Sequence, residues 1–174
     1  MRTLTRHVNQ ARKPAAAPLD DATQQALEHL AAKGFRLPDR PAGERPTLPA
    51  DVTELSDEEL MSLYAQTVAW TQYAAGQCAI AEVAERTAED RLEEAKAAAI
   101  VTGSGKTATA LKASAADNPA VIAARQKHAE TYALRKLMAV VASAAENDTK
   151  FLSRDLTRRT GISDQTRRNN KWNT

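Results

Sequence analysis

The fold is decided by residues 56–107, which read SDEELMSLYAQTVAWTQYAAGQCAIAEVAERTAEDRLEEAKAAAIVTGSGKT and contain no proline. The start resembles a capping box, in which the Ser56 hydroxyl accepts from the Glu59 N–H and the Glu59 carboxylate accepts from the Ser56 N–H. Apolar residues then recur at three- and four-residue spacing, as on one face of a helix. We therefore expect one amphipathic helix over 57–101, roughly 68 Å long.

A second long helix is expected over residues 119–159. Asn118 suits the N-cap and Pro119 suits the first helical position. Gly161 is expected to end this helix, and residues 108–116 are expected to form a helical turn or two before it starts. The two long helices should fold back on one another as an antiparallel, coiled-coil-like hairpin.

Four interior residues of these helices need an interpretation. Gly76 costs about 1 kcal/mol relative to alanine inside a helix, so it marks either a kink or a close crossing with another helix. Cys78 lies among alanines and is expected to be a small buried residue rather than a reactive thiol. Tyr132 and Met138 belong to an apolar stripe and are interpreted as core residues rather than cofactor contacts.

The first part of the chain is expected to be an arm over residues 1–50. It contains one short helix, at 22–33, for which Asp20 or Asp21 is the N-cap. The four prolines of residues 35–50 exclude a helix there and favour an extended connector. The sequence thus divides into this arm, the helical hairpin of residues 51–160, and a basic tail of residues 161–174.

Composition favours long helices that are completed by self-association. The chain has 174 residues, of which 36 are alanine and only two each are phenylalanine and tryptophan. Alanine buries little surface, but it has the best helix propensity and permits close helix approach. We predict an all-α fold, a long antiparallel hairpin with a short N-terminal helix and extended basic termini, and we expect it to form a homo-oligomer.

The net charge of +2 hides a strong asymmetry along the chain. Residues 51–95 carry two basic and eleven acidic groups, whereas residues 150–174 carry seven basic and two acidic groups. A basic end on an acidic body favours either an anionic partner or head-to-tail attraction between subunits. The residues expected to contact nucleic acid are Lys106, Lys112, Arg154, Arg158, Arg159, Arg167, Arg168 and Lys171 at phosphates, with Trp172 stacking on a base.

Several other classes of function are not expected. No apolar run approaches the length of a membrane span, and one cysteine with three histidines makes no structural zinc site. The TGSGKT segment is no phosphate loop, because Ile100 stands where that motif requires glycine. A helix-turn-helix motif around Gly161 is disfavoured, because Arg167 and Asn170 occupy positions that should be apolar. We expect a non-enzymatic, intracellular protein without a cofactor.

Over residues 57–159 the chain resembles the UvsY-type phage recombination mediators. The positions that carry this resemblance are Trp70, Thr102-Gly103-Ser104-Gly105, Ala116-Asp117 with Val121, Tyr132, and Ser153-Arg154. The resemblance implies a small helical protein that assembles into a ring, binds single-stranded DNA and helps to load a recombinase. The basic pair of that family falls on Ala95 and Ala97 here, so other cations would have to make its contact with the strand.

Two hypotheses follow for the function. The leading one is a non-enzymatic oligomer that binds single-stranded DNA as a phage recombination mediator in the host cytoplasm. The alternative is a structural protein of a virion or of its assembly, such as a scaffold, connector or packaging subunit. In that case the hairpin would make contacts between subunits, and the proline-rich arm and the basic tail would reach neighbouring virion proteins. The chain would then show no salt-sensitive affinity for DNA.

Overall fold

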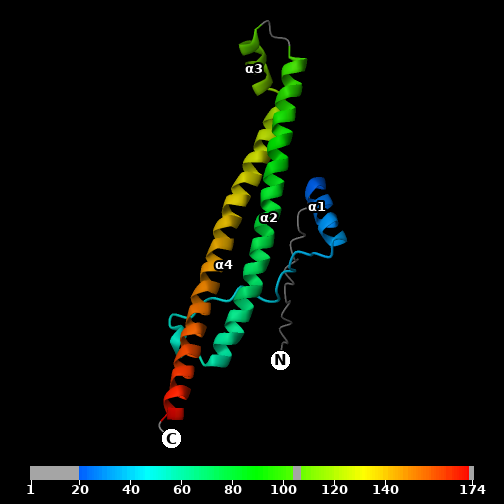
Figure 1. Cartoon of the computed structure of the whole chain (residues 1–174). Helices are drawn as coiled ribbons and strands as arrows, with labels where there is room; N and C mark the ends of the chain where they lie inside the picture. The colour runs from blue at the N-terminus through cyan, green and yellow to red at the C-terminus, as the bar shows by residue number, and fades with distance from the viewer. Residues whose placement is uncertain (1–19, 104–106, 173–174) are drawn as a thin grey trace, which may run out of the picture.

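The computed structural model describes residues 20–103 and 107–172, and in the last helix it describes the side chains as far as Ile162, together with that of Gln165. The helical elements are α1 (Asp21–Ala32), the 3₁₀ turn η1 (Val52–Glu54), α2 (Asp57–Thr102), α3 (Ala108–Ala116) and α4 (Pro119–Trp172). Within these ranges there is no strand. The expected all-α class is confirmed, and α2 and α4 lie side by side as an antiparallel pair (Figure 1).

Helix α2 begins and ends as the sequence predicted. The Glu59 N–H donates to the Ser56 hydroxyl at 3.2 Å, and the Ser56 N–H donates to the Glu59 carboxylate at 2.9 Å. The hydrogen bonds from Ser56 also hold the pKa of Glu59 below its usual value. Helix α2 then runs unbroken for 46 residues, which is about 70 Å. Helix α4 starts as predicted, since the Ala120 N–H donates to the Asn118 side chain at 2.9 Å.

The two long helices pack through a seven-residue repeat. On α2 the buried face carries Ala74, Ala81 and Ala88 at that spacing. Alanines at the contact allow two helix backbones to approach closely, which is how a chain poor in large apolar residues still forms a seam. The largest fully buried side chains lie near the two ends of the hairpin. Leu60 and Leu152 are fully buried at the open end, where α2 begins, and Val121 is 1% exposed near the turn.

Polar groups inside this seam are paired across it. The Thr71 hydroxyl lies 3.0 Å from the Ala145 carbonyl oxygen and 2.8 Å from the Thr149 hydroxyl. Further along, Arg135 of α4 forms an ion pair with Glu85 of α2, and both side chains are largely buried. Pairing of this kind removes the cost of burying polar groups and also fixes the register of the two helices.

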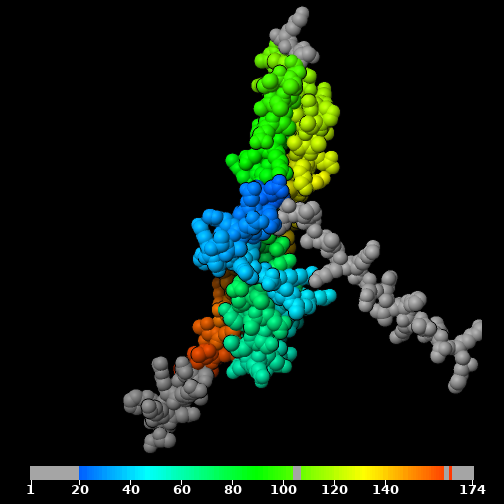
Figure 2. Space-filling view, turned by 90° about the vertical axis from the view of Figure 1, so that its right-hand side faces the viewer, coloured from blue at the N-terminus to red at the C-terminus, as the bar shows by residue number. Residues whose placement is uncertain are grey.

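The described part of the N-terminal arm, which begins at Asp20, lies over the middle of the hairpin (Figure 2). Helix α1 is capped as predicted, with the Thr23 N–H donating to Asp20 at 3.0 Å, and it contacts α2. The connector that follows crosses α2 at Gly76, where Leu37 and Pro38 pack above the glycine. Gly76 therefore does not break α2, and the close approach there is made by the connector rather than by another helix.

Two expectations about α4 are wrong. Helix α4 continues through Gly161 to Trp172, so Gly161 does not end the helix and residues 161–172 are helical rather than extended. This glycine sits in open space with an ordinary helical φ, where nothing forces a turn. Tyr132 is 45% exposed rather than part of the core. The apolar stripe predicted for α4 is in fact two rows on different faces, and only one of them packs on α2.

Candidate nucleic-acid interface

The residues predicted to bind nucleic acid fall into two groups at opposite ends of the hairpin. Lys112 lies on α3, which sits at the turn between the long helices, whereas Arg154, Arg158 and Arg159 lie towards the far end of α4 (Figure 1). The two ends are separated by most of the length of α2, about 70 Å. The predicted residues therefore do not form one surface, and Lys106 lies outside the described residues.

At the turn, Lys112 lines a hollow between α2, α3 and α4. The hollow has a volume of about 370 Å³, and its charged residues are Glu93, Lys96, Lys112 and Arg125. Its floor is apolar and includes residues of one core cluster, Ala115 and Val121, with Ile100 packed against them. Lys96 forms an ion pair with Glu93 at 2.8 Å. Three cations against one carboxylate leave a local excess of positive charge that favours an anion.

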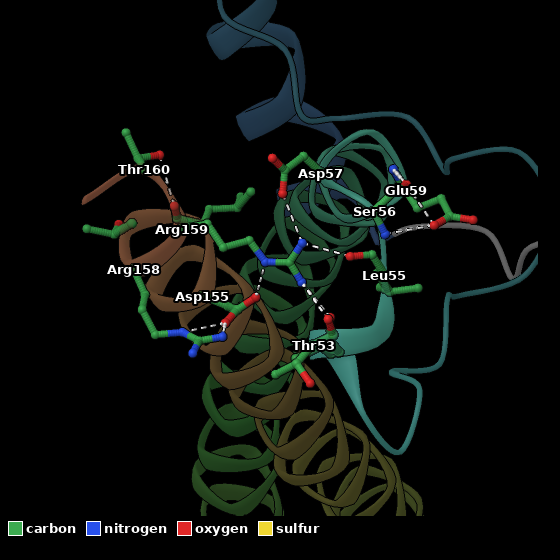
Figure 3. Close-up of polar contacts among 12 residues, drawn as sticks. Thr53, Leu55, Ser56, Asp57, Glu59, Asp155, Arg158, Arg159 and Thr160 are labelled. Carbon is green, nitrogen blue, oxygen red and sulfur yellow. Dashed lines mark hydrogen bonds and ion pairs between the residues drawn. The ribbon is translucent and has the colours of Figure 1, made fainter. Parts of the chain in front are cut away.

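At the open end, Arg159 binds the chain itself. Its guanidinium donates to the carbonyl oxygens of Leu55 at 2.7 Å and Val52 at 2.8 Å, and to the carboxylates of Asp57 and Asp155, each at 2.9 Å (Figure 3). Its side chain is 18% exposed. The carboxylates of Asp57 and Asp155 raise its pKa. Arg159 thus ties η1 and the start of α2 to α4, and its donors are occupied by the fold.

Arg158 and Arg154 are better placed for an outside partner. Arg158 donates to Asp155 at 2.7 Å, but 56% of its side chain remains exposed. The hydrogen bonds from Arg158, and then from Arg159, hold the pKa of Asp155 below its usual value. Asp155 is therefore a carboxylate that orients both arginines, one inward and one outward. Arg154 is exposed on the same helix, one turn before Arg158.

Beyond Arg159, α4 projects past the start of α2 (Figure 1). Arg159 contacts Asp57, the first residue of α2, so the remainder of α4 lies beyond the paired part of the hairpin. This projection, residues 160–172, contains Arg167, Arg168, Lys171 and Trp172 in helical conformation. The side chains of these four predicted contact residues lie outside the description.

The role of Arg159 was missed because its partners are distant in the sequence. The spacing of Asp155 from Arg158 and Arg159 is a visible signal for ion pairs within one helix. The contacts with η1 and α2 span more than a hundred residues and have no local signal. The same holds for the ion pair between Arg45 of the connector and Asp148 of α4.

Other kinds of site find no support in the described part of the chain. No cluster of histidine, cysteine, aspartate and glutamate side chains within residues 20–103 and 107–172 could hold a metal ion. Among the helices of the same ranges, none combines the length and the hydropathy that a membrane span requires. Comparisons of the chain with protein-family models, with curated proteins and with solved structures find no significant match.

Proposed function

We propose that the protein is a non-enzymatic, self-associating protein that binds single-stranded nucleic acid through the projecting end of α4. The observation that carries this proposal is the continuation of α4 past the hairpin, with Arg167, Arg168 and Lys171 on a helix that α2 does not cover. In proteins most helical stability comes from tertiary packing, and α2 does not pack on this end of α4, so a partner that covers it is expected. Phosphates would neutralise its charge.

The residues at the base of the projection support the same proposal. Arg154 and Arg158 are exposed there and add two positive charges at the base of the projection. Arg159 is withdrawn from the proposed contact set, because its donors hold η1 and α2. Lys112, with Lys96 and Arg125, is too far away to contact the same few nucleotides, so it would bind a second segment of strand.

The proposal is tested by fluorescence anisotropy with a labelled oligo-dT at two salt concentrations. The full chain and a chain that ends at Thr160 are compared. The full chain is expected to bind, with an affinity that falls with salt at a log–log slope of roughly −3.5 for five neutralised phosphates. The shortened chain should lose this binding. As a matched control, Arg86→Ala removes an exposed cation from α2, and it should change little.

Absence of binding by the full chain at low salt would rule the proposal out. If the shortened chain bound oligo-dT equally well, the binding site would be assigned to the turn between the long helices. The variants Lys112→Ala and Arg125→Ala would then test that assignment. The role of recombination mediator, which the resemblance to the UvsY-type proteins implies, predicts in addition that the protein speeds the loading of a recombinase on a strand covered by single-strand-binding protein.

A second candidate function is that of a structural protein in a virion or its assembly. It is favoured by one observation, a row of exposed aliphatic side chains on the face of α4 that points away from α2. Such a surface suits permanent contacts between subunits. A fixed copy number in an assembled particle, together with no salt-sensitive binding of oligo-dT, would favour this function over the first.

A further inference from the structure

The face of α4 that points away from α2 carries a second row of apolar side chains. Four aliphatic residues in the middle of the helix are between 42% and 67% exposed. We call this row the outer seam, and it consists of Ala133, Leu134, Leu137, Val140, Val141, Ala144 and Phe151. Exposed apolar residues are ordinary when scattered singly, but a contiguous row on one helix face marks an interaction surface.

The spacing of the outer seam shows what kind of element fits it. One row on this face alternates in steps of four and three, which is the repeat of a coiled coil, at residues 133, 137, 140, 144, 147 and 151. Position 147 of this row is the polar Asn147, and Leu134 and Val141 flank the row on one side. The row of α4 that packs on α2 has the same alternation, at residues 131, 135, 138, 142, 145, 149 and 152. Since the inner row holds a helix, the outer seam is shaped to hold a helix as well.

We propose that the outer seam binds the outer seam of a second copy of this chain, with the two α4 helices antiparallel and a two-fold axis level with residues 138–139. This deepens the self-association within the proposed function and rests on that part of it. The axis lies at the centre of the exposed aliphatic cluster. Two hairpins joined in this way make an arrangement of four long helices.

In this alignment the apolar side chains meet one another. Leu137 lies opposite the partner's Val140, and Ala133 lies opposite the partner's Ala144. Leu134 packs beside the partner's Val141 along one edge of the seam, whereas Phe151 lies opposite the partner's Gln126. The two-fold axis makes each of these contacts occur twice, so every aliphatic residue of the cluster is covered by the partner. Leu137 and Val140, the two most exposed members, come to lie nearest to the axis.

The charges select the antiparallel arrangement. Glu130 of one copy lies opposite Asn147 of the other, whose amide can donate to it. At the edge of the seam, Lys127 lies near the partner's Asp148, a carboxylate that is already paired with Arg45 of its own chain. Lys127, Glu130 and Asn147 are exposed, and Asp148 is 30% exposed beside Arg45. A parallel pair in register would instead set Glu130 against Glu130 and Arg154 against Arg154. Like charges in such positions are unfavourable.

The test is the mass of the full chain in sedimentation velocity, over a range of concentrations and without nucleic acid. The wild-type chain is expected to form a dimer. Leu137→Asp should raise the dissociation constant about a hundredfold or more, because it puts a charge into the apolar centre of the interface. Met61→Asp is the matched control, since Met61 is 52% exposed on α2, and it should leave the dimer intact.

Asn147 variants test the direction of the helices. Asn147→Lys sets a cation against the partner's Glu130 and should tighten the dimer, whereas Asn147→Glu should weaken it about tenfold. In a parallel pair Asn147 faces its own copy, so both variants would weaken it. Circular dichroism should show the same helical content in all variants, because none of these side chains belongs to the inner row, which packs on α2.

A monomeric wild-type chain at high concentration, or a Leu137→Asp variant with unchanged mass, would overturn the inference. Weakening by both Asn147 variants would overturn the antiparallel alignment. The sedimentation experiment contains no nucleic acid, so its outcome is independent of the anisotropy experiment. A chain that dimerises but does not bind oligo-dT would refute only the binding part of the proposed function. A monomer that binds oligo-dT would refute only the interface.

Discussion

The guanidinium of Arg159 lies 2.9 Å from the carboxylate of Asp57, although the two residues are 102 positions apart in the chain. Around this pair, Arg159 also binds backbone carbonyls of η1 and of the residue that joins η1 to the α2 cap. Asp57 is 84% exposed, so the pair by itself contributes little to stability. The strength of the contact comes from several donors of one planar group meeting several fixed acceptors.

Replacing Arg159 with alanine is predicted to lower the thermal midpoint by several degrees. The change removes the side-chain donor from the carbonyl oxygens of Val52 and Leu55 and loosens the start of α2. Differential scanning calorimetry at one fixed protein concentration would measure it. Arg158→Ala is the matched control, since it removes a neighbouring and more exposed arginine, and its effect should be clearly smaller. An equal effect of the two changes would contradict the assigned role of Arg159.

Stability is predicted to fall in acid because of Asp155. The pKa of its carboxyl is lowered in the folded protein, so the stabilisation is fully present above the unfolded value near 3.8 and is lost as the pH falls through the folded value. Asp155→Asn should therefore be less stable than wild type at pH 7, with a difference that shrinks below about pH 4. Urea unfolding at pH 7, 5 and 3 checks this. If the difference in stability between wild type and Asp155→Asn stayed constant from pH 7 to pH 3, titration of the Asp155 carboxyl would not be the cause of the loss in acid.

Gly76→Ala is predicted to stabilise the protein by about 0.5–1 kcal/mol. A Cβ at this position would lie 3.7 Å from the nearest Leu37 methyl carbon, which is ordinary van der Waals contact. The gain comes from the higher helix propensity of alanine inside α2. Urea unfolding of the two chains measures it. Gly76→Leu is the contrasting variant, because it should displace the connector and lower stability.

Leu152→Ala is predicted to destabilise the protein by about 3 kcal/mol, since it empties a fully buried site between Leu60 and Val52. Met61→Ala removes a side chain of similar size that is half exposed on α2, and it should cost less than about 1 kcal/mol. Urea unfolding gives both values. Similar losses for the two variants would mean that the open end of the hairpin is not packed as described.

The helices could be predicted because their signals are local. The Ser56–Glu59 capping box, the Asn118 cap and the Asp20 cap each involve residues within three positions of one another, and all three are formed. The three- and four-residue spacing of apolar side chains likewise predicted both long helices. It did not separate the two rows of α4, because a stripe of apolar residues does not say which of them will meet α2.

The candidate site could be predicted only as a set of charges. Sequence shows that Arg158 and Arg159 are adjacent, but not that the first points outward and the second holds η1. That difference depends on how the start of α2 meets α4, a contact between distant residues. Gly161 misled the prediction for a similar reason: a glycine permits a helix to end but does not require it to, and α4 continues through this one.

The hairpin has a consequence for the order in which the molecule folds. Near the turn, Leu92 and Val121 share one core cluster and are close in sequence, whereas Leu60 and Leu152 share the other across nearly the whole hairpin. Contacts between near residues cost less chain entropy to form, so we expect pairing to start at the turn and to proceed towards Arg159. Unzipping runs in reverse, and amide hydrogens at the open end should exchange first.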